Sequence, residues 1–173
     1  MGSEPASGSE REHAREAQQG HPATLRPTVK IKTTLGDIVV ALDAEKAPGT
    51  VMNFLDYVTD GYYDGTVFHR VVQGSVVQGG GYASDMTEKK AGVRPAIADE
   101  SYNGLKTERW TIAMFRVPGD FKSARTQFFI NVVDHPSFDR LRDGSGYTVF
   151  GRVVGGIDTV ERIRDTKVGT HPN

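Results

Sequence analysis

Short strand-like runs, separated by clusters of glycine, proline and aspartate, dominate the sequence after residue 28. Residues 29–33 and 37–42 alternate apolar and polar side chains around a Leu35-Gly36-Asp37 turn, which predicts an antiparallel hairpin. The other runs of this kind are residues 66–72, 111–115, 127–132 and 148–154. So many short strands beside only two helical stretches predict a mainly β fold, a closed antiparallel barrel rather than a sheet of β-α-β units.

Two stretches have the 3.6-residue period of a helix. The first opens at Pro48, where the missing N–H of proline has no consequence, and is expected to end near Gly61. Its expected buried stripe is Val51, Phe54, Leu55 and Val58. The second opens with the spacing of a capping box, Asp158-Thr159-Val160-Glu161. It is expected to bury Ile157, Val160 and Ile163.

The first 28 residues differ in composition from the rest of the chain. They contain no aromatic residue, and Met1 and Leu25 are their only large apolar side chains. Such a segment buries too little surface to offset the entropy of ordering it. We expect residues 1–28 to be a flexible tail, with a docking or anchoring arm as the alternative. Residues 29–173 are then one domain of ordinary size.

Composition excludes several partners and chemistries. The 21 Lys and Arg residues nearly balance the 22 Asp and Glu residues, so there is no basic excess for binding nucleic acid. The absence of cysteine excludes disulfides, a cysteine nucleophile and cysteine-bound zinc. No apolar run approaches the roughly 18–20 residues of a membrane span, and residues 1–28 contain no signal-peptide core. We expect a monomer that is cytoplasmic as the chain is written, or periplasmic if a signal peptide has been removed.

Several familiar site motifs are incomplete. The glycine cluster at residues 74–81 lacks both the Lys-Ser/Thr pair of a phosphate loop and a helix-opening G-x-G-x-x-G array. Ser145 lacks the outer spacing of a nucleophile elbow. The five histidines show no metal-binding spacing, and His135 with Asp134 and Pro136 is typical of a turn. We therefore expect no metal and no cofactor.

Four segments carry a resemblance to a known family. They are residues 67–72 (VFHRVV), 77–81 (VQGGG), 123–132 (SARTQFFINV) and 147–153 (YTVFGRV). Together they resemble the cyclophilins, a family of peptidyl-prolyl cis-trans isomerases. The residues between them that look like the bacterial branch are Glu100, 103–105 and 112–114. The resemblance spans residues 29–169 and implies an eight-stranded antiparallel barrel capped by two helices. It also implies proline-containing peptides and unfolded or folding proteins as partners.

An isomerase of this kind needs no nucleophile, general base or metal. Rotation about an X-Pro amide crosses a barrier of about 18–20 kcal/mol because the C–N bond is partly double. In the twisted transition state the prolyl nitrogen regains its lone pair, so a donor aimed at it binds this state better than either planar one. Arginine suits the task because it is permanently charged and carries several planar donors.

The resemblance assigns roles to particular residues. It makes Arg70 the donor, Gln78 a hydrogen-bond partner of the substrate backbone, and Phe129 the floor beneath the proline ring. The other expected substrate-binding residues are His69, Ser75, Val76, Phe115, Gln127, Phe138 and Tyr147. Three more phenylalanines are expected in the core, namely Phe68, Phe128 and Phe150. The alternative for the arginine is a surface charge at the end of a strand.

The sequence departs from the family pattern around the proline pocket. Ser75 and Val76 stand where relatives usually have Phe and Met, and Phe115 stands where they usually have alanine. Burying a large apolar side chain is worth about 1.5–3 kcal/mol, so peptides and cyclosporin-like ligands are expected to bind more weakly. Phe115 either refills the space left at Ser75 or obstructs the groove. Trp110 stands where relatives usually have glycine, and we expect it to lie on the exposed surface or to make a local contact.

The relatives also continue past the position of Asn173 into a last barrel strand. That strand is expected to be missing from this chain, which leaves the first strand with an unpaired edge. Two functions stay open on the sequence. One is an active prolyl isomerase that assists protein folding, favoured by the joint presence of Arg70, Gln78 and Phe129. The other is a cyclophilin-fold module that binds proline peptides with weak or no turnover.

Overall fold

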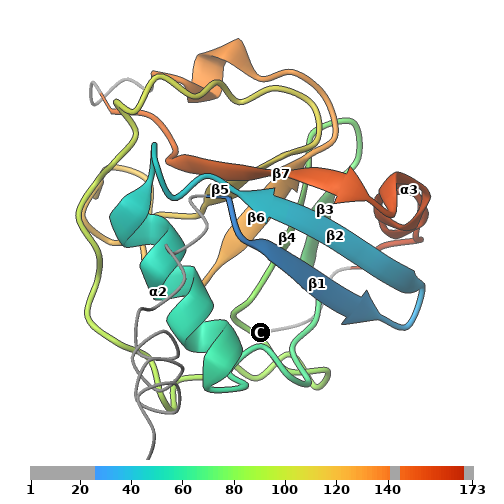
Figure 1. Ribbon diagram of the computed structural model, residues 1–173. Coiled ribbons are helices and arrows are strands. Elements are labelled where there is room, and N and C mark those ends of the chain that lie inside the picture. The colour runs from blue at the N-terminus through green and yellow to red at the C-terminus, as the bar shows by residue number, and fades with distance from the viewer. Residues whose placement is uncertain (1–25, 141–144, 170–173) are drawn as a thin grey trace, which may run out of the picture.

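A curled antiparallel sheet is the central element of the computed structural model of the chain, which describes residues 26–140 and 145–169 (Figure 1). Within these residues the sheet has seven strands in the order β1-β2-β7-β5-β6-β4-β3. The strands are β1 (Thr28–Thr33), β2 (Gly36–Leu42), β3 (Arg70–Val72), β4 (Val76–Gly79), β5 (Thr111–Met114), β6 (Phe128–Asn131) and β7 (Val149–Gly155). The helices are α2 (Pro48–Thr59), α3 (Ile157–Arg164) and the short 3-10 helix η1 (Pro136–Phe138). None of the described helices is long and apolar enough to cross a membrane.

The predicted N-terminal hairpin is confirmed. Strands β1 and β2 pair antiparallel, and the turn between them brings Thr33 opposite Gly36. The first strand begins at Thr28, and the carbonyl of Pro27 already accepts a hydrogen bond from the amide of Leu42 at 2.8 Å. Of the tail expected over residues 1–28, residues 1–25 lie outside the described ranges.

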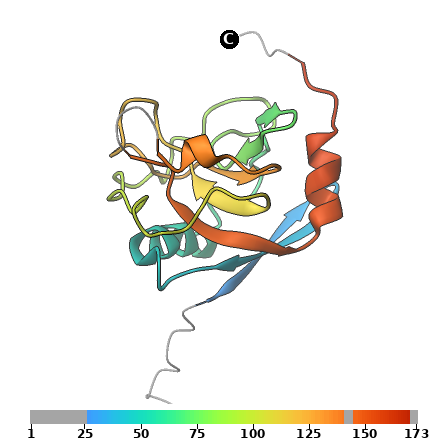
Figure 2. The same ribbon diagram turned by 90° about the horizontal axis from the view of Figure 1, so that it is seen from above.

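The sheet is an open half-barrel in the described residues, and the expected closed, eight-stranded barrel is not confirmed. Strands β1 and β3 are its two edges, and no described strand joins them. The curl is visible from above in Figure 2. Between the two edges lies a groove of about 580 Å³. Its apolar lining includes Val29, Ile31, Phe54, Phe68, Phe128 and Ile163.

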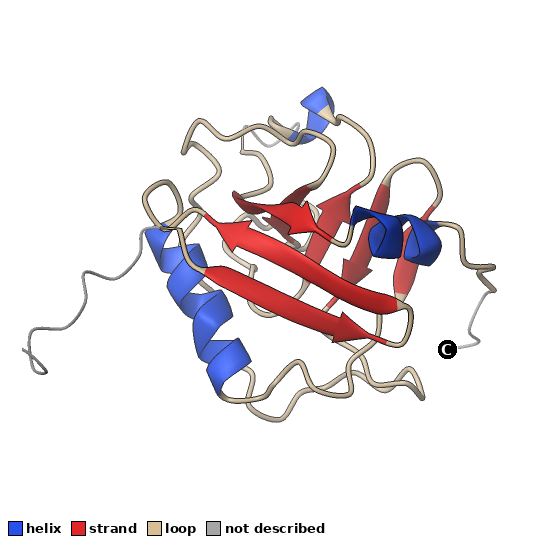
Figure 3. Cartoon of the chain, turned by 45° about the vertical axis from the view of Figure 1, so that its right-hand side comes forward, coloured by secondary structure: helices blue, strands red, loops and turns tan. Residues whose placement is uncertain are grey.

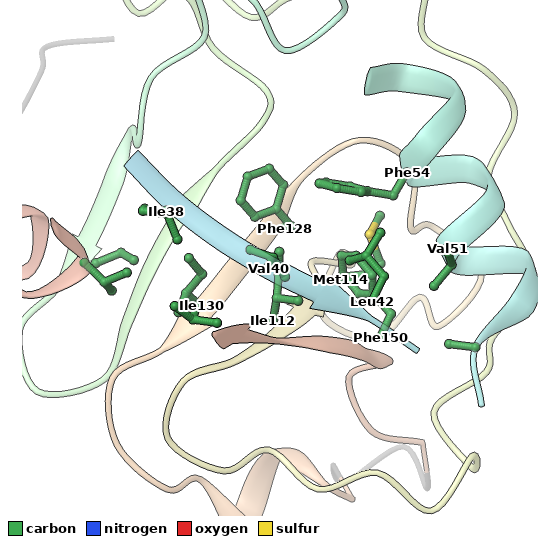
Figure 4. Packing of buried hydrophobic residues seen from close by; sticks show 14 of the residues in the cluster. Ile38, Val40, Leu42, Val51, Phe54, Ile112, Met114, Phe128, Ile130 and Phe150 are labelled. Atoms are coloured by element: carbon green, nitrogen blue, oxygen red, sulfur yellow. The ribbon is translucent and has the colours of Figure 1, made fainter. Parts of the chain in front are cut away.

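The core fills the concave side of the sheet (Figure 4). On β2 every second side chain points inward, so Ile38, Val40 and Leu42 are buried, as the alternation predicts. Phe128 and Phe150 belong to this core, as expected. The expected core residue Phe68 is half-buried and packs against its edge.

Helix α2 begins at Pro48 as predicted, but its buried face differs in part from the expected stripe. Val51 and Phe54 are buried, whereas Val58 is exposed and Tyr57 is buried instead. This difference has a tertiary cause, because the hydroxyl of Tyr57 accepts a hydrogen bond from the backbone amide of Arg94 at 2.7 Å. The helix therefore docks with its tyrosine turned inward. Figure 3 shows α2 and α3 at opposite ends of the sheet.

The predicted capping box of helix α3 is wrong. The residue before the helix is Gly156, in the left-handed region with φ 74°, and no side chain caps the helix. A Cβ at Gly156 would lie 2.0 Å from the carbonyl oxygen of Asp37, so only glycine fits this turn. The turn draws the start of the helix to the surface, and Ile157 is exposed rather than buried. Val160 and Ile163 are buried, as predicted.

Strand β4 is not among the predicted strands, because its glycine-rich surroundings (residues 74–81) are typical of loops. The glycines instead let neighbouring segments of the chain approach closely. A Cβ at Gly80, which has φ +85°, would lie 2.9 Å from the carbonyl oxygen of Thr126. At Gly81 a Cβ would lie 2.7 Å from the side chain of Gln127. The cluster serves packing between β4 and the chain that enters β6.

Candidate active site

Residues from four neighbouring strands form one row across the sheet. Strand register places Arg70 of β3 opposite Gln78 of β4, and Gln78 opposite Phe129 of β6. Phe129 in turn pairs with Ala113 of β5. Directly paired residues point to the same face of a sheet. The three residues expected to be catalytic are therefore side by side, although they are distant in the sequence.

This row lies on the convex face of the sheet, opposite the main core. Val77, Ile112 and Phe128 point into the core, while their strand neighbours point the other way. On the convex face Val76, Ala113, Phe129 and Val149 form a second buried cluster. Half-buried side chains pack against it, among them Phe115, Phe138 and Tyr147. The sheet thus separates a structural core from a candidate site.

A chain of hydrogen bonds orients the polar end of the row. Nε2 of Gln78 donates to Oε1 of Gln127 at 2.8 Å. The amide oxygen of Gln78 therefore faces Arg70, whose Nη1 donates to it at 3.3 Å. Gln78 is 3% exposed, whereas Arg70 is exposed. The buried glutamine holds one edge of the guanidinium, and a guanidinium carries five donors in all.

Three aromatic rings form the apolar end of the row. The rings of Phe129, Phe138 and Tyr147 meet edge to face, with centroids 5.0–6.1 Å apart. Edge-to-face pairs of this kind add about 0.5–1.5 kcal/mol beyond the burial of their area. Phe129 is buried and the other two are half-buried, so the cluster offers a floor with partly open walls. Such a surface suits an apolar ring.

A buried arginine supports one of these walls. The guanidinium carbon of Arg116 lies 5.4 Å from the ring centre of Tyr147, in a cation–π contact. Its Nε donates to the carbonyl of Gly146 at 3.2 Å, and its Nη2 donates to the hydroxyl of Ser145 at 3.0 Å. The arginine thus ties the segment that carries Tyr147 to the end of β5.

His69 does not join the aromatic cluster. Its ring centre lies 4.4 Å from that of Tyr82 instead. Burial lowers the pKa of His69, and the neighbouring charge of Arg70 lowers this pKa further, while hydrogen bonds with Val67 and Gln127 oppose the shift. The neutral imidazole is therefore favoured.

At Ser75 the structure shows a polar pair that the sequence does not predict. The hydroxyl of Ser75 lies 3.0 Å from Nε2 of His135, and the ring of His135 stacks on Phe138. The sequence indicates only a turn at this histidine. The stacking of His135 on Phe138 has a signal in the sequence. His135 precedes Phe138 by three positions, and residues three apart in a 3-10 turn lie on the same side.

The chain is similar to proteins of one known family. The family model described as "Cyclophilin type peptidyl-prolyl cis-trans isomerase/CLD" matches residues 28–173. Peptidyl-prolyl cis-trans isomerase A of Dickeya dadantii is 44% identical over 154 residues, which cover 87% of this chain and 80% of the relative. Peptidyl-prolyl cis-trans isomerase cyp18 of Streptomyces antibioticus is 45% identical over 146 residues, which cover 83% of this chain and 86% of the relative.

Among solved structures, a cyclophilin-type peptidyl-prolyl cis-trans isomerase of Cryptosporidium parvum has a similar fold. The TM-score is 0.65 at 26% sequence identity, and the match covers 80% of this chain and 85% of the other. That crystal structure was determined in the presence of the dipeptide Ala-Pro.

Proposed function

The chain belongs to the cyclophilin-type peptidyl-prolyl cis-trans isomerase family, and we propose that Arg70, Gln78 and Phe129 carry its activity. The protein is an isomerase of X-Pro peptide bonds and assists protein folding. The observation that supports these three residues most strongly is their register, which aligns a cationic donor, an amide and an aromatic floor across adjacent strands.

The row fits the shape of a prolyl peptide. The proline ring packs on Phe129, against the edges of Phe138 and Tyr147. The second N–H of the Gln78 amide, which Gln127 leaves available, donates to a carbonyl of the substrate backbone. This places the X-Pro bond between the aromatic floor and the guanidinium of Arg70.

Catalysis then follows from one change in the substrate. As the amide twists, conjugation is lost and the prolyl nitrogen becomes pyramidal, with a lone pair that accepts a hydrogen bond. Arg70 donates to that nitrogen, and it gains this contact only in the twisted state, which is the condition for a higher rate. Each 1.36 kcal/mol of such selective binding is worth about tenfold in rate. Gln78 keeps the guanidinium in place and limits its motion during the rotation.

The substrate class is proline-containing peptides and unfolded or folding proteins. The Cryptosporidium relative studied with the dipeptide Ala-Pro supports this class. The small side chain of Ser75 and the larger one of Phe115 favour weaker binding than a pocket with Phe and Ala at these positions. Retention of Arg70 beside Gln78 supports turnover over binding alone, because a pure binding module has no use for a donor to the twisted amide.

The proposed activity is tested by exchange NMR on a short Ala-Pro peptide with the purified chain. We expect catalytic amounts to raise the cis-trans exchange rate well above the uncatalysed value, which corresponds to tens to hundreds of seconds. The protein after heat denaturation is the control. Saturable binding of the peptide without faster exchange would overturn the isomerase and leave the binding module.

We also propose that one further extended strand fits the groove between β1 and β3 and closes the barrel. The edge strand β1 supports this, because Val29 and Ile31 are partly buried at the groove while Lys30 between them is exposed. A strand with apolar residues at every second position complements this pattern. A synthetic heptapeptide that alternates valine and threonine is expected to raise the Tm, and Ile31→Asp is expected to abolish the increase. An unchanged Tm at millimolar peptide contradicts the closure.

A further inference from the structure

The turn before β4 and the loop after β6 meet at Ser75 and His135. Nε2 of His135 lies 3.0 Å from the hydroxyl oxygen of Ser75 and 3.2 Å from its carbonyl oxygen. A carbonyl oxygen can only accept, so Nε2 carries the proton and donates to Ser75. The same carbonyl accepts the amide of Val132 at 2.9 Å, which fixes it beside the sheet. The imidazole is therefore anchored to the backbone next to β4.

The backbone of His135 is fixed as well. Its amide donates to the carbonyl of Thr107 at 2.8 Å, and the hydroxyl of Thr107 donates back to the carbonyl of His135. That carbonyl also accepts the amide of Phe138 at 2.8 Å and so forms the turn of η1. Both ends of this side chain, the Cα and the ring tip, are thus held by residues outside the turn.

The anchored imidazole lies flat on Phe138. The two ring centres are 4.4 Å apart and the planes differ by 16°. The ring centre of Phe138 also lies 6.1 Å from that of Phe129 and 5.2 Å from that of Tyr147, both in edge-to-face arrangements. Phe138 is only half-buried, and stacking with His135 takes up one face of its ring.

We propose that His135 is a positioning residue for the proline pocket. Anchored by Ser75, it holds Phe138 as an upright wall beside Phe129, and it thereby sets how tightly the proline ring binds. The small side chain at position 75 leaves room for the imidazole at a place where a phenylalanine would exclude it. The inference rests on the proposed function of the row and adds a determinant of affinity, separate from the rotation step at Arg70.

The test separates binding from rotation with the full chain and an Ala-Pro peptide. Chemical-shift titration gives the Kd, and exchange NMR at saturating peptide gives the rotation rate. For His135→Ala we expect the Kd to rise about three- to tenfold, the range of one aromatic contact. The rotation rate at saturation is expected to stay within about twofold. Ser137→Ala, an exposed change in the same 3-10 turn, is the matched control and is expected to keep the original Kd.

Two further variants separate the ring from its anchor. His135→Phe keeps a stacking ring without the bond to Ser75, and His135→Gln keeps a donor near the place of Nε2 without the ring. Each is expected to recover part of the lost affinity, and a Tm within a few degrees of the original shows that the fold is intact. They also replace His135→Ala if that variant does not fold.

Three results overturn the positioning role. They are an unchanged Kd in His135→Ala, no recovery in either His135→Phe or His135→Gln, and a rotation rate that falls in parallel with affinity. Failure of the proposed function is recognised separately, because the unaltered chain then binds the peptide without accelerating its exchange. A chain that isomerises normally while the His135 variants bind normally refutes only the positioning role.

Discussion

Replacing Gly81 with alanine is expected to impair the enzyme through a neighbour. A Cβ at Gly81 would lie 2.7 Å from three atoms of the Gln127 side chain, Cγ, Cδ and Nε2. Contacts this short do not persist, and a flexible glutamine moves more easily than backbone. Gln127 is then displaced from Nε2 of Gln78, its hydrogen-bond partner at 2.8 Å.

The size of the effect follows from the burial of Gln78, which is 3% exposed. Leaving a buried donor without a partner costs about 1–3 kcal/mol. For a chain of this length, each kcal/mol lowers the Tm by roughly 2–4 °C. The amide of Gln78 also loses the contact that turns its oxygen toward Arg70. We expect kcat/KM on an Ala-Pro peptide to fall about three- to tenfold, equivalent to roughly 0.7–1.4 kcal/mol of transition-state binding.

A double-mutant cycle tests this route. Gln127→Ala removes all three atoms that the new Cβ would meet, so adding Gly81→Ala to it is expected to have no further effect on kcat/KM. Gly169→Ala is the matched control, because that glycine is exposed and a Cβ added there would meet no described atom within 4 Å. If Gly81→Ala lowers kcat/KM by the same factor with and without Gln127, the displacement mechanism is wrong.

Three more outcomes are expected from local features. Trp110 has φ 69°, a backbone region in which non-glycine residues are strained. Trp110→Gly should therefore be more stable to thermal unfolding than Trp110→Ala by about 1 kcal/mol. Equal Tm values for the two variants would contradict this. The carboxylate of Glu100 caps the start of α2, because it accepts hydrogen bonds from the amides of Gly49 and Thr50 at 3.0 and 2.8 Å. Glu100→Gln should therefore lower the free energy of unfolding by about 1 kcal/mol. An unchanged urea midpoint would refute this capping role. Because burial lowers the pKa of His69 in the folded chain, the unfolded chain binds the proton more readily, and stability should fall as the pH drops below about 6.5. His69→Gln should make that decline shallower in urea titrations, and an identical slope would contradict the assigned burial.

The elements that the sequence predicts well are those whose pattern is local. The alternation of Ile38, Val40 and Leu42 is enough to place one face of β2 in the core. Strand β4 is not predicted because Gly79 and its neighbours are typical of a loop when taken alone. Their role depends on the segments of the chain that pack against them. Tyr57 replaces Val58 on the buried face of α2 for the same reason, since its partner is the distant amide of Arg94.

The candidate site shows the same division. The resemblance predicts Arg70, Gln78 and Phe129 as site residues from short motifs. Their alignment depends on the register of β3, β4 and β6, which no local pattern encodes. The suggestion that Phe115 refills the space at Ser75 stays a prediction. The partner that the structure gives to Ser75 is His135, from a loop whose approach to β4 depends on the tertiary fold.

The central claim, that Arg70 binds the twisted amide selectively, is tested most directly by exchange NMR on Arg70→Ala and Arg70→Lys with a saturating Ala-Pro peptide. We predict that the rotation rate falls at least about tenfold in Arg70→Ala, equivalent to roughly 1.4 kcal/mol, while the peptide Kd changes by less than about threefold. Arg70→Lys should recover only part of the rate, because a lysine keeps the charge but lacks the planar set of donors. A rotation rate in Arg70→Ala equal to that of the original chain would contradict the claim.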